Sequence, residues 1–158
     1  MKNFEKFMRA AVELSREKMN ENAGGPFGAV IVQNEKIVGR GWNAVSSKND
    51  PTAHAEISAI RDACQNLKTF DLSGCEIFTS CEPCPMCLGA ILWARISKIF
   101  YANTARDAAE IAGFDDENFY AEFQKSPADR RIPSQQIGRD AAIEVFREWH
   151  KKYDKIEY

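Results

Sequence analysis

Two short motifs that lie well apart in the chain constrain its folding most. The first is His54-Ala55-Glu56, and the second is Pro83-Cys84-Pro85-Met86-Cys87. Cysteines three positions apart on the first turn of a helix point the same way, so Cys84 and Cys87 can bind one ion together. The positive end of the helix dipole also favours their thiolate form. If the motifs make one site, the fold has to bring them together.

Imidazole nitrogen and thiolate sulfur are ligands that zinc prefers, and a catalytic zinc keeps one tetrahedral position open for water. His54, Cys84 and Cys87 are therefore the predicted ligands of one zinc ion per subunit. Glu56 can then reach the zinc-bound water without being a ligand. This arrangement requires His54 at a helix end, because positions two apart inside a helix diverge. Zinc-bound hydroxide beside a carboxylate predicts a hydrolytic reaction in which Glu56 moves the protons.

Other interpretations of the same cysteines remain open. Cys81 precedes Cys84 by three residues, so it could close the metal shell as a fourth ligand and leave a structural site. A dithiol redox motif of Cys81 and Cys84 would leave His54 and Glu56 without a role. A zinc-stabilised interaction module with no enzymatic activity is a third alternative. We favour the open catalytic site, because structural sites rarely place a carboxylate beside a closed shell.

Predicted helices and strands alternate along the chain. The helices are expected at about 3–20, 53–67, 85–93, 116–124 and 139–153; the strands at 27–33, 36–42, 76–79 and 97–101, with a turn or short strand at 132–137. The turn at Asn34-Glu35 makes the first two strands a hairpin, and Thr52 is placed to cap the second helix. The pattern predicts a single α/β domain over 1–158, with helices on both faces of a mixed, roughly five-stranded sheet.

Charge and hydropathy narrow the expected partners and location. The net charge is -2 and the pI about 5.8, which argues against a protein whose main task is binding nucleic acid. No secretory signal opens the chain and no apolar run is long enough to span a bilayer, so we expect no membrane partner. Five cysteines, three of them clustered, suit a metal or catalytic role in the cytoplasm better than disulfides.

The pattern H-x-E followed by P-C-x-x-C is the signature of zinc nucleobase deaminases. Over nearly its whole length the chain resembles one branch of them, the small bacterial guanine deaminases of the cytidine deaminase fold. The resemblance rests on residues 25–32, 49–56, 79–90 and 112–116 and on the final Glu157-Tyr158. The second and third blocks belong partly to the wider superfamily. The resemblance implies a three-layer α/β/α cytidine deaminase-like fold.

The same resemblance implies hydrolysis of guanine, a purine base, to xanthine and ammonia. The residues that it places around the base are Phe27, Asn43, Ala55, Asp115 and Tyr158. Phe27 would lie against the face of the base, Asn43 would hydrogen-bond it, and Asp115 would accept from its ring N–H and amine. Tyr158 would arrive from the partner subunit of a homodimer that exchanges a C-terminal segment, about 139–158.

Local sequence reasoning alone leaves these base-binding positions open. Asp115 also suits a helix N-cap, and Asn43 suits a turn. Phe27 would ordinarily lie in the core, and a terminal Tyr158 would ordinarily be frayed.

A tRNA adenosine deaminase shares the zinc motifs and is the main alternative activity. It should carry a basic C-terminal helix, whereas Arg147 and Lys151 here are interleaved with Glu144 and Glu148. A cytosine or cytidine deaminase comes third, because Asp115 on the base edge argues against it.

Overall fold

The computed structural model describes residues 4–114 and 118–158. The chain divides into two compact units, Met1–Glu117 and Asn118–Tyr158. Within the described residues, the first unit holds the sheet and the second holds two helices.

The sheet of the first unit has the strand order β2-β1-β3-β4. Its strands are β1 (Gly28–Gln33), β2 (Lys36–Trp42), β3 (Glu76–Cys81) and β4 (Lys98–Asn103). β1 pairs antiparallel with β2 and β3, and β3 pairs parallel with β4, so the sheet is mixed as predicted. Both turn residues of the hairpin, Asn34 and Glu35, have positive φ, as a type I′ turn requires.

The described residues form four strands, so the expectation of roughly five was wrong. The segment 132–137, expected to be a turn or short strand, pairs with no strand in the described structure. Pro133 lacks the N–H that a sheet ladder needs, which disfavours pairing there.

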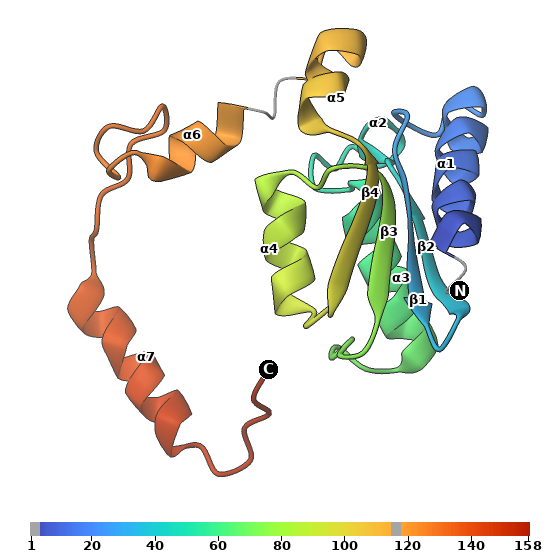
Figure 1. The fold of residues 1–158 in the computed structure, drawn as a ribbon. Coiled ribbons are helices and arrows are strands. Elements are labelled where there is room, and N and C mark those ends of the chain that lie inside the picture. The colour runs from blue at the N-terminus through green and yellow to red at the C-terminus, as the bar shows by residue number, and fades with distance from the viewer. Residues whose placement is uncertain (1–3, 115–117) are drawn as a thin grey trace. The chain divides into compact units, whose positions relative to one another are not determined.

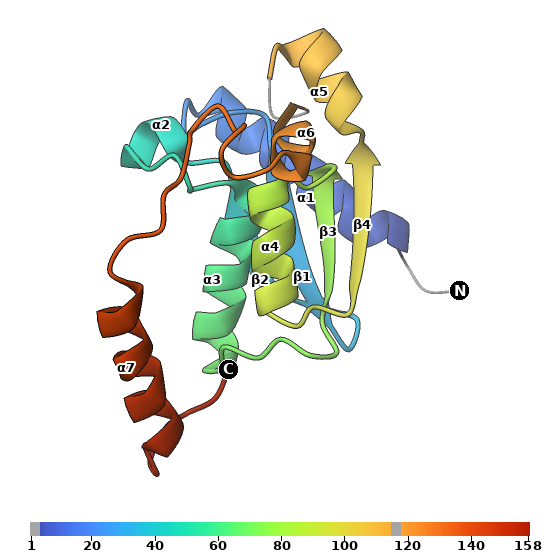
Figure 2. The same ribbon diagram turned by 90° about the vertical axis from the view of Figure 1, so that its left-hand side faces the viewer.

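Helices cover both faces of the sheet, which confirms the three-layer α/β/α arrangement (Figure 1). On one face, α1 (Phe4–Asn20) buries Phe7 and Ala11 against Phe78 and the β1 valines. On the other lie α3 (Ala55–Leu67) and α4 (Pro85–Trp93), which run side by side in the turned view (Figure 2). The core on this face consists mainly of small and aliphatic side chains: Ala29, Ile31, Ala55, Ala59, Ala63, Leu72, Cys75, Ile77, Ile91 and Ala94.

Glycines in β2 let α3 approach the sheet closely. A Cβ added to Gly41 would lie 2.1 Å from the carbonyl oxygen of Ala55 and 2.2 Å from the amide nitrogen of Ala59. No side chain fits in that space, so the first turn of α3 rests directly on the backbone of β2. This contact fixes where the H-x-E motif lies.

The start of α3 differs from the prediction. The helix begins at Ala55, and its N-cap is His54 and not Thr52. The Thr52 amide and hydroxyl both donate to Asp50 Oδ1, 2.8 and 2.7 Å away, which makes a local turn in place of a helix cap. His54 therefore lies at the helix end, as the predicted metal site requires.

Two short helices were not predicted from the sequence. These are α2 (Val45–Lys48) and α5 (Ala105–Ala112). A capping box begins α5: the side chain of Thr104 accepts from the Asp107 amide, and the Asp107 carboxylate accepts from the Thr104 amide. No helix in the described parts of the chain is long and apolar enough to cross a membrane.

The second unit contains α6 (Phe119–Gln124) and α7 (Arg139–Lys151). Both lie close to their predicted positions, although Asp116, the predicted start of the first, falls outside the described residues. Neither helix has a buried residue. In particular, Val145, Phe146 and Trp149 of α7 are exposed.

Candidate metal centre and active site

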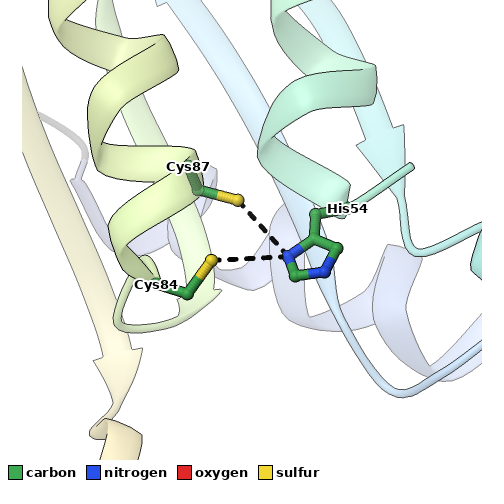
Figure 3. A group of neighbouring side chains, drawn as sticks. All are labelled: His54, Cys84 and Cys87. Atoms are coloured by element: carbon green, nitrogen blue, oxygen red, sulfur yellow. Dashed lines mark hydrogen bonds between the residues drawn. The ribbon is translucent and has the colours of Figure 1, made fainter. Parts of the chain in front are cut away.

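The first turns of α3 and α4 bring the two sequence motifs together. His54 is the N-cap of α3, Cys84 is the N-cap of α4, and Cys87 lies on the first turn of α4. The Nδ1 atom of His54 lies 3.6 Å from Cys84 Sγ and 3.4 Å from Cys87 Sγ, with both sulfurs pointing at the ring (Figure 3). The three predicted ligand residues thus form one group, whose ligand atoms lie within 4.8 Å of one another.

These distances fit a zinc ion. Tetrahedral zinc with bonds of about 2.3 Å to sulfur and about 2.0 Å to nitrogen separates the two ligand atoms by roughly 3.5 Å. The hydrogen bond from Cys87 lowers the pKa of Cys84 to about 4, and the same bond raises the pKa of Cys87. One thiolate is therefore present at neutral pH, and zinc binding would displace the proton of the second.

Cys81 does not join the metal-binding group among the described residues. Its sulfur lies 3.5 Å from the carbonyl oxygen of Thr104, to which it donates a hydrogen bond. The geometry therefore favours a three-ligand group over a closed shell of one histidine and three cysteines, the alternative that the sequence left open.

Glu56 lies on the first turn of α3, with only 7% of its surface exposed. Burial raises the pKa of its carboxyl group, while hydrogen bonds from its own backbone N–H and from Cys87 oppose that shift. The hydroxyl of Thr79 donates to Glu56 Oε1 over 3.4 Å. A buried carboxyl beside the metal-binding group, with a raised pKa, suits a group that takes up and releases a proton.

Asn43 and Phe27 are held by one set of backbone hydrogen bonds. The Asn43 amide nitrogen donates to the Phe27 carbonyl oxygen, and Asn43 Oδ1 accepts from the amides of Gly25 and Val45. Among the described residues, Asn43 Nδ2 makes no hydrogen bond, so its donors stay available for a ligand. The ring of Phe27 meets Phe114 edge-on, with ring centroids 4.7 Å apart.

Three predicted base-binding residues remain: Ala55, Asp115 and Tyr158. Ala55 is buried, and its backbone N–H, at the first position of α3, has no acceptor among the described residues. Asp115 falls outside the described residues. Tyr158 belongs to the second unit, where 75% of its surface is exposed.

Thr79 and Phe114 were missed as site residues. Both stand in the sequence blocks that carry the resemblance, but a threonine in a strand and a phenylalanine after a helix look like ordinary structure. Only their contacts with Glu56 and Phe27 single them out.

Comparison with known proteins places the chain among the deaminases. The family model described as the cytidine and deoxycytidylate deaminase zinc-binding region matches residues 1–103. Guanine deaminase of Bacillus subtilis is 49% identical over 156 residues, which cover 99% of each chain. The X-ray structure of guanine deaminase from that organism matches with a TM-score of 0.95 over 99% of each chain.

More distant relatives share less of the chain. The structure of guanine deaminase from Nitrosomonas europaea matches with a TM-score of 0.64 at 33% identity, over 90% of this chain and 81% of that one. A tRNA-specific adenosine deaminase of Buchnera aphidicola is 45% identical over 87 residues, which are 55% of this chain and 58% of that protein. The match to the Bacillus enzyme extends well beyond the zinc-binding region, whereas the match to the tRNA enzyme covers little more than half of the chain.

Proposed function

Since this chain belongs to the cytidine and deoxycytidylate deaminase family of zinc enzymes, we propose that it hydrolyses guanine to xanthine and ammonia. The observation that carries the choice of base is the likeness to the Bacillus guanine deaminase over 99% of the chain, at a TM-score of 0.95. The tRNA-specific relative shares only 55% of the chain.

His54 Nδ1 and the sulfurs of Cys84 and Cys87 are the atoms that would hold the zinc ion. When bound there, zinc supplies a Lewis acid that makes water a nucleophile at neutral pH. Glu56 accepts the proton of the attacking water. It passes this proton to the ring nitrogen next to the amine-bearing carbon. It then takes the second proton of the former water from the new hydroxyl group on that carbon and gives it to the amine, which leaves as ammonia.

The base would be held by groups that the fold leaves available. Asn43 Nδ2 donates to an acceptor of the base, because Oδ1 is already held by two backbone amides. The Ala55 N–H donates to a second acceptor, and the Phe27 ring packs on the face of the base. We assign Asp115 to the ring N–H and amine edge, where a carboxylate matches the donors of guanine.

Charge in the second unit weighs against a tRNA substrate. Lys152 pairs with Asp154, Arg147 pairs with Glu144, and Lys155 lies 3.3 Å from Glu157. Each of these cations is neutralised by a neighbouring carboxylate, so they offer little attraction to phosphates.

The test is ammonia release by the zinc-loaded protein from guanine, adenine, cytosine, cytidine and a tRNA anticodon stem-loop. We expect release from guanine alone. Glu56→Ala should keep its zinc and lose at least about 100-fold in kcat, since general acid–base catalysis contributes that much or more. Ammonia release only from the stem-loop would identify the protein as a tRNA adenosine deaminase and contradict the roles of Asp115 and Tyr158.

The C-terminal segment 139–158 is proposed to be exchanged between the subunits of a homodimer, so that Tyr158 completes the partner's site. The support is that α7 has no buried residue and exposes Val145, Phe146 and Trp149, a face that needs a covering partner. A cytoplasmic location is also proposed, because the ligand thiols must stay reduced to bind zinc.

Mixed dimers test the exchange directly. Glu56→Ala and Tyr158→Ala chains, each of which we expect to be inactive alone, are coexpressed and purified as dimers. With exchange, each mixed dimer holds one complete site, so activity per subunit recovers to roughly a quarter of the wild-type value. Without exchange, no site contains both Glu56 and Tyr158, and the mixture stays inactive.

A further inference from the structure

One buried hydroxyl in the sheet has no part in the mechanism above. Thr79 lies in β3 and has only 1% of its surface exposed. Its Oγ1 donates to Glu56 Oε1 over 3.4 Å, and it has no other hydrogen-bond partner among the described residues.

The surroundings of Thr79 do not call for a hydroxyl. Side chains alternate along a strand, so Thr79 faces the same side of the sheet as Ile77, which belongs to the apolar core beneath α3 and α4. Valine would match the shape of threonine in that position and would avoid the cost of burying a hydroxyl. Packing alone therefore does not explain a threonine here.

We infer that Thr79 is a positioning residue for Glu56: its hydroxyl holds Oε1, so that the other carboxylate oxygen faces the reacting groups. This inference rests on the proposed role of Glu56 as proton carrier. Without the hydroxyl, nothing in β3 fixes the rotation of the Glu56 carboxylate about the terminal bonds of its side chain. A displacement of about 1 Å in a reacting group can cost 100-fold in rate.

The experiment compares Thr79→Val and Thr79→Ser with the wild-type protein. For Thr79→Val we expect kcat to fall by about 10- to 100-fold while KM for guanine stays within about twofold. The substitution removes the alignment of the Glu56 carboxylate but leaves the groups that bind the base in place. Thr79→Ser keeps the hydroxyl and should recover kcat to within about threefold of wild type. Zinc content and melting temperature should stay at wild-type values in both variants.

Ser15→Ala is the matched control for loss of a buried hydroxyl. The Ser15 hydroxyl donates to the Val12 carbonyl oxygen inside α1, on the opposite face of the sheet. We expect no change in kcat from this substitution. Equal losses in Ser15→Ala and Thr79→Val would assign the effect to general destabilisation and overturn the inference.

A structural readout separates this inference from the choice of substrate. Crystal structures of the zinc-loaded wild type and Thr79→Val should show one Glu56 carboxylate orientation in the first and a rotated or mixed orientation in the second. The same orientation in both overturns the positioning role, whichever base the enzyme deaminates. Failure of guanine turnover by the wild type, with the rotation still seen, would contradict only the proposed substrate.

Discussion

At the scale of single residues, the structure distinguishes between three closely spaced cysteines. Cys84 and Cys87 point at His54 Nδ1, whereas Cys81 ends β3 and donates to the Thr104 carbonyl oxygen. The difference follows from local geometry, because Cys81 is still in the strand and the other two belong to the first turn of α4.

Cysteine substitutions should separate these roles. Cys87→Ser removes a thiolate ligand, so we expect zinc content to fall well below one ion per chain, and activity to fall with it. Cys81→Ser should keep one zinc ion per chain, as measured by atomic absorption after dialysis. Loss of zinc from Cys81→Ser would instead support the four-ligand structural site with Cys81 as a ligand.

The Phe27–Phe114 contact predicts an effect on base binding. Aromatic pairs of this kind contribute about 0.5 to 1.5 kcal/mol, so loosening Phe27 by Phe114→Leu should raise KM for guanine roughly 2- to 10-fold. kcat should change less, because Glu56 and the metal ligands are untouched. Steady-state kinetics measure both constants, and a fall in kcat at constant KM would argue against a base-stacking role for Phe27.

At the scale of the elements, the site depends on where α3 begins and on how closely it approaches the sheet. His54 can ligate and Glu56 can turn inward because the helix starts between them, at Ala55. The bare backbone of β2 at Gly39 and Gly41 sets the distance of α3 from the sheet. A shift of this helix would move His54 and Glu56 together, away from the cysteines of α4.

Two glycine substitutions test this dependence. A Cβ at Gly41 meets the Ala55 carbonyl oxygen at 2.1 Å, and one at Gly39 meets the Ala59 carbonyl oxygen, further along α3, at 2.6 Å. Each alanine substitution should cost about 1 to 3 kcal/mol of unfolding free energy in denaturant titrations, as overpacked sites do. Gly41→Ala should lose far more activity than Gly39→Ala, and equal losses would show that the start of α3 is not specially sensitive.

At the scale of the whole molecule, we expect the packing of the first unit to be independent of the metal. Its two core clusters lie on opposite faces of the sheet and contain many fully buried aliphatic side chains. The second unit, in contrast, has helices without a buried residue.

Metal removal tests this independence. After chelation we expect deaminase activity to vanish and to return with added zinc, while far-UV circular dichroism and a cooperative melt persist at a somewhat lower temperature. The lower melting temperature reflects the loss of a ligand that binds only the folded state. Unfolding on chelation, with no activity when zinc is restored, would support the zinc-stabilised interaction module instead.

Much of the fold and the metal site could be predicted from the sequence, for a local reason. A hairpin turn, an amphipathic α1 and a proline-initiated α4 are encoded by neighbouring residues, and each was found close to its predicted bounds. The three residues of the metal-binding group could be named because H-x-E and P-C-x-x-C combine residue types that zinc chemistry requires. The start of α3 was placed too early, because Asp50 competes for the Thr52 hydroxyl that was expected to cap the helix.

Only the tertiary structure decided which residues distant in the sequence contact each other. The sequence by itself determined the chemical types in the site, but not that Cys81 turns to Thr104, that Thr79 meets Glu56 or that Phe114 meets Phe27. These contacts depend on the register of β3 against its neighbours and on the distance at which α3 packs on β2. Such quantities come from the packing of the whole unit, because no local pattern specifies which side chains face each other across a sheet.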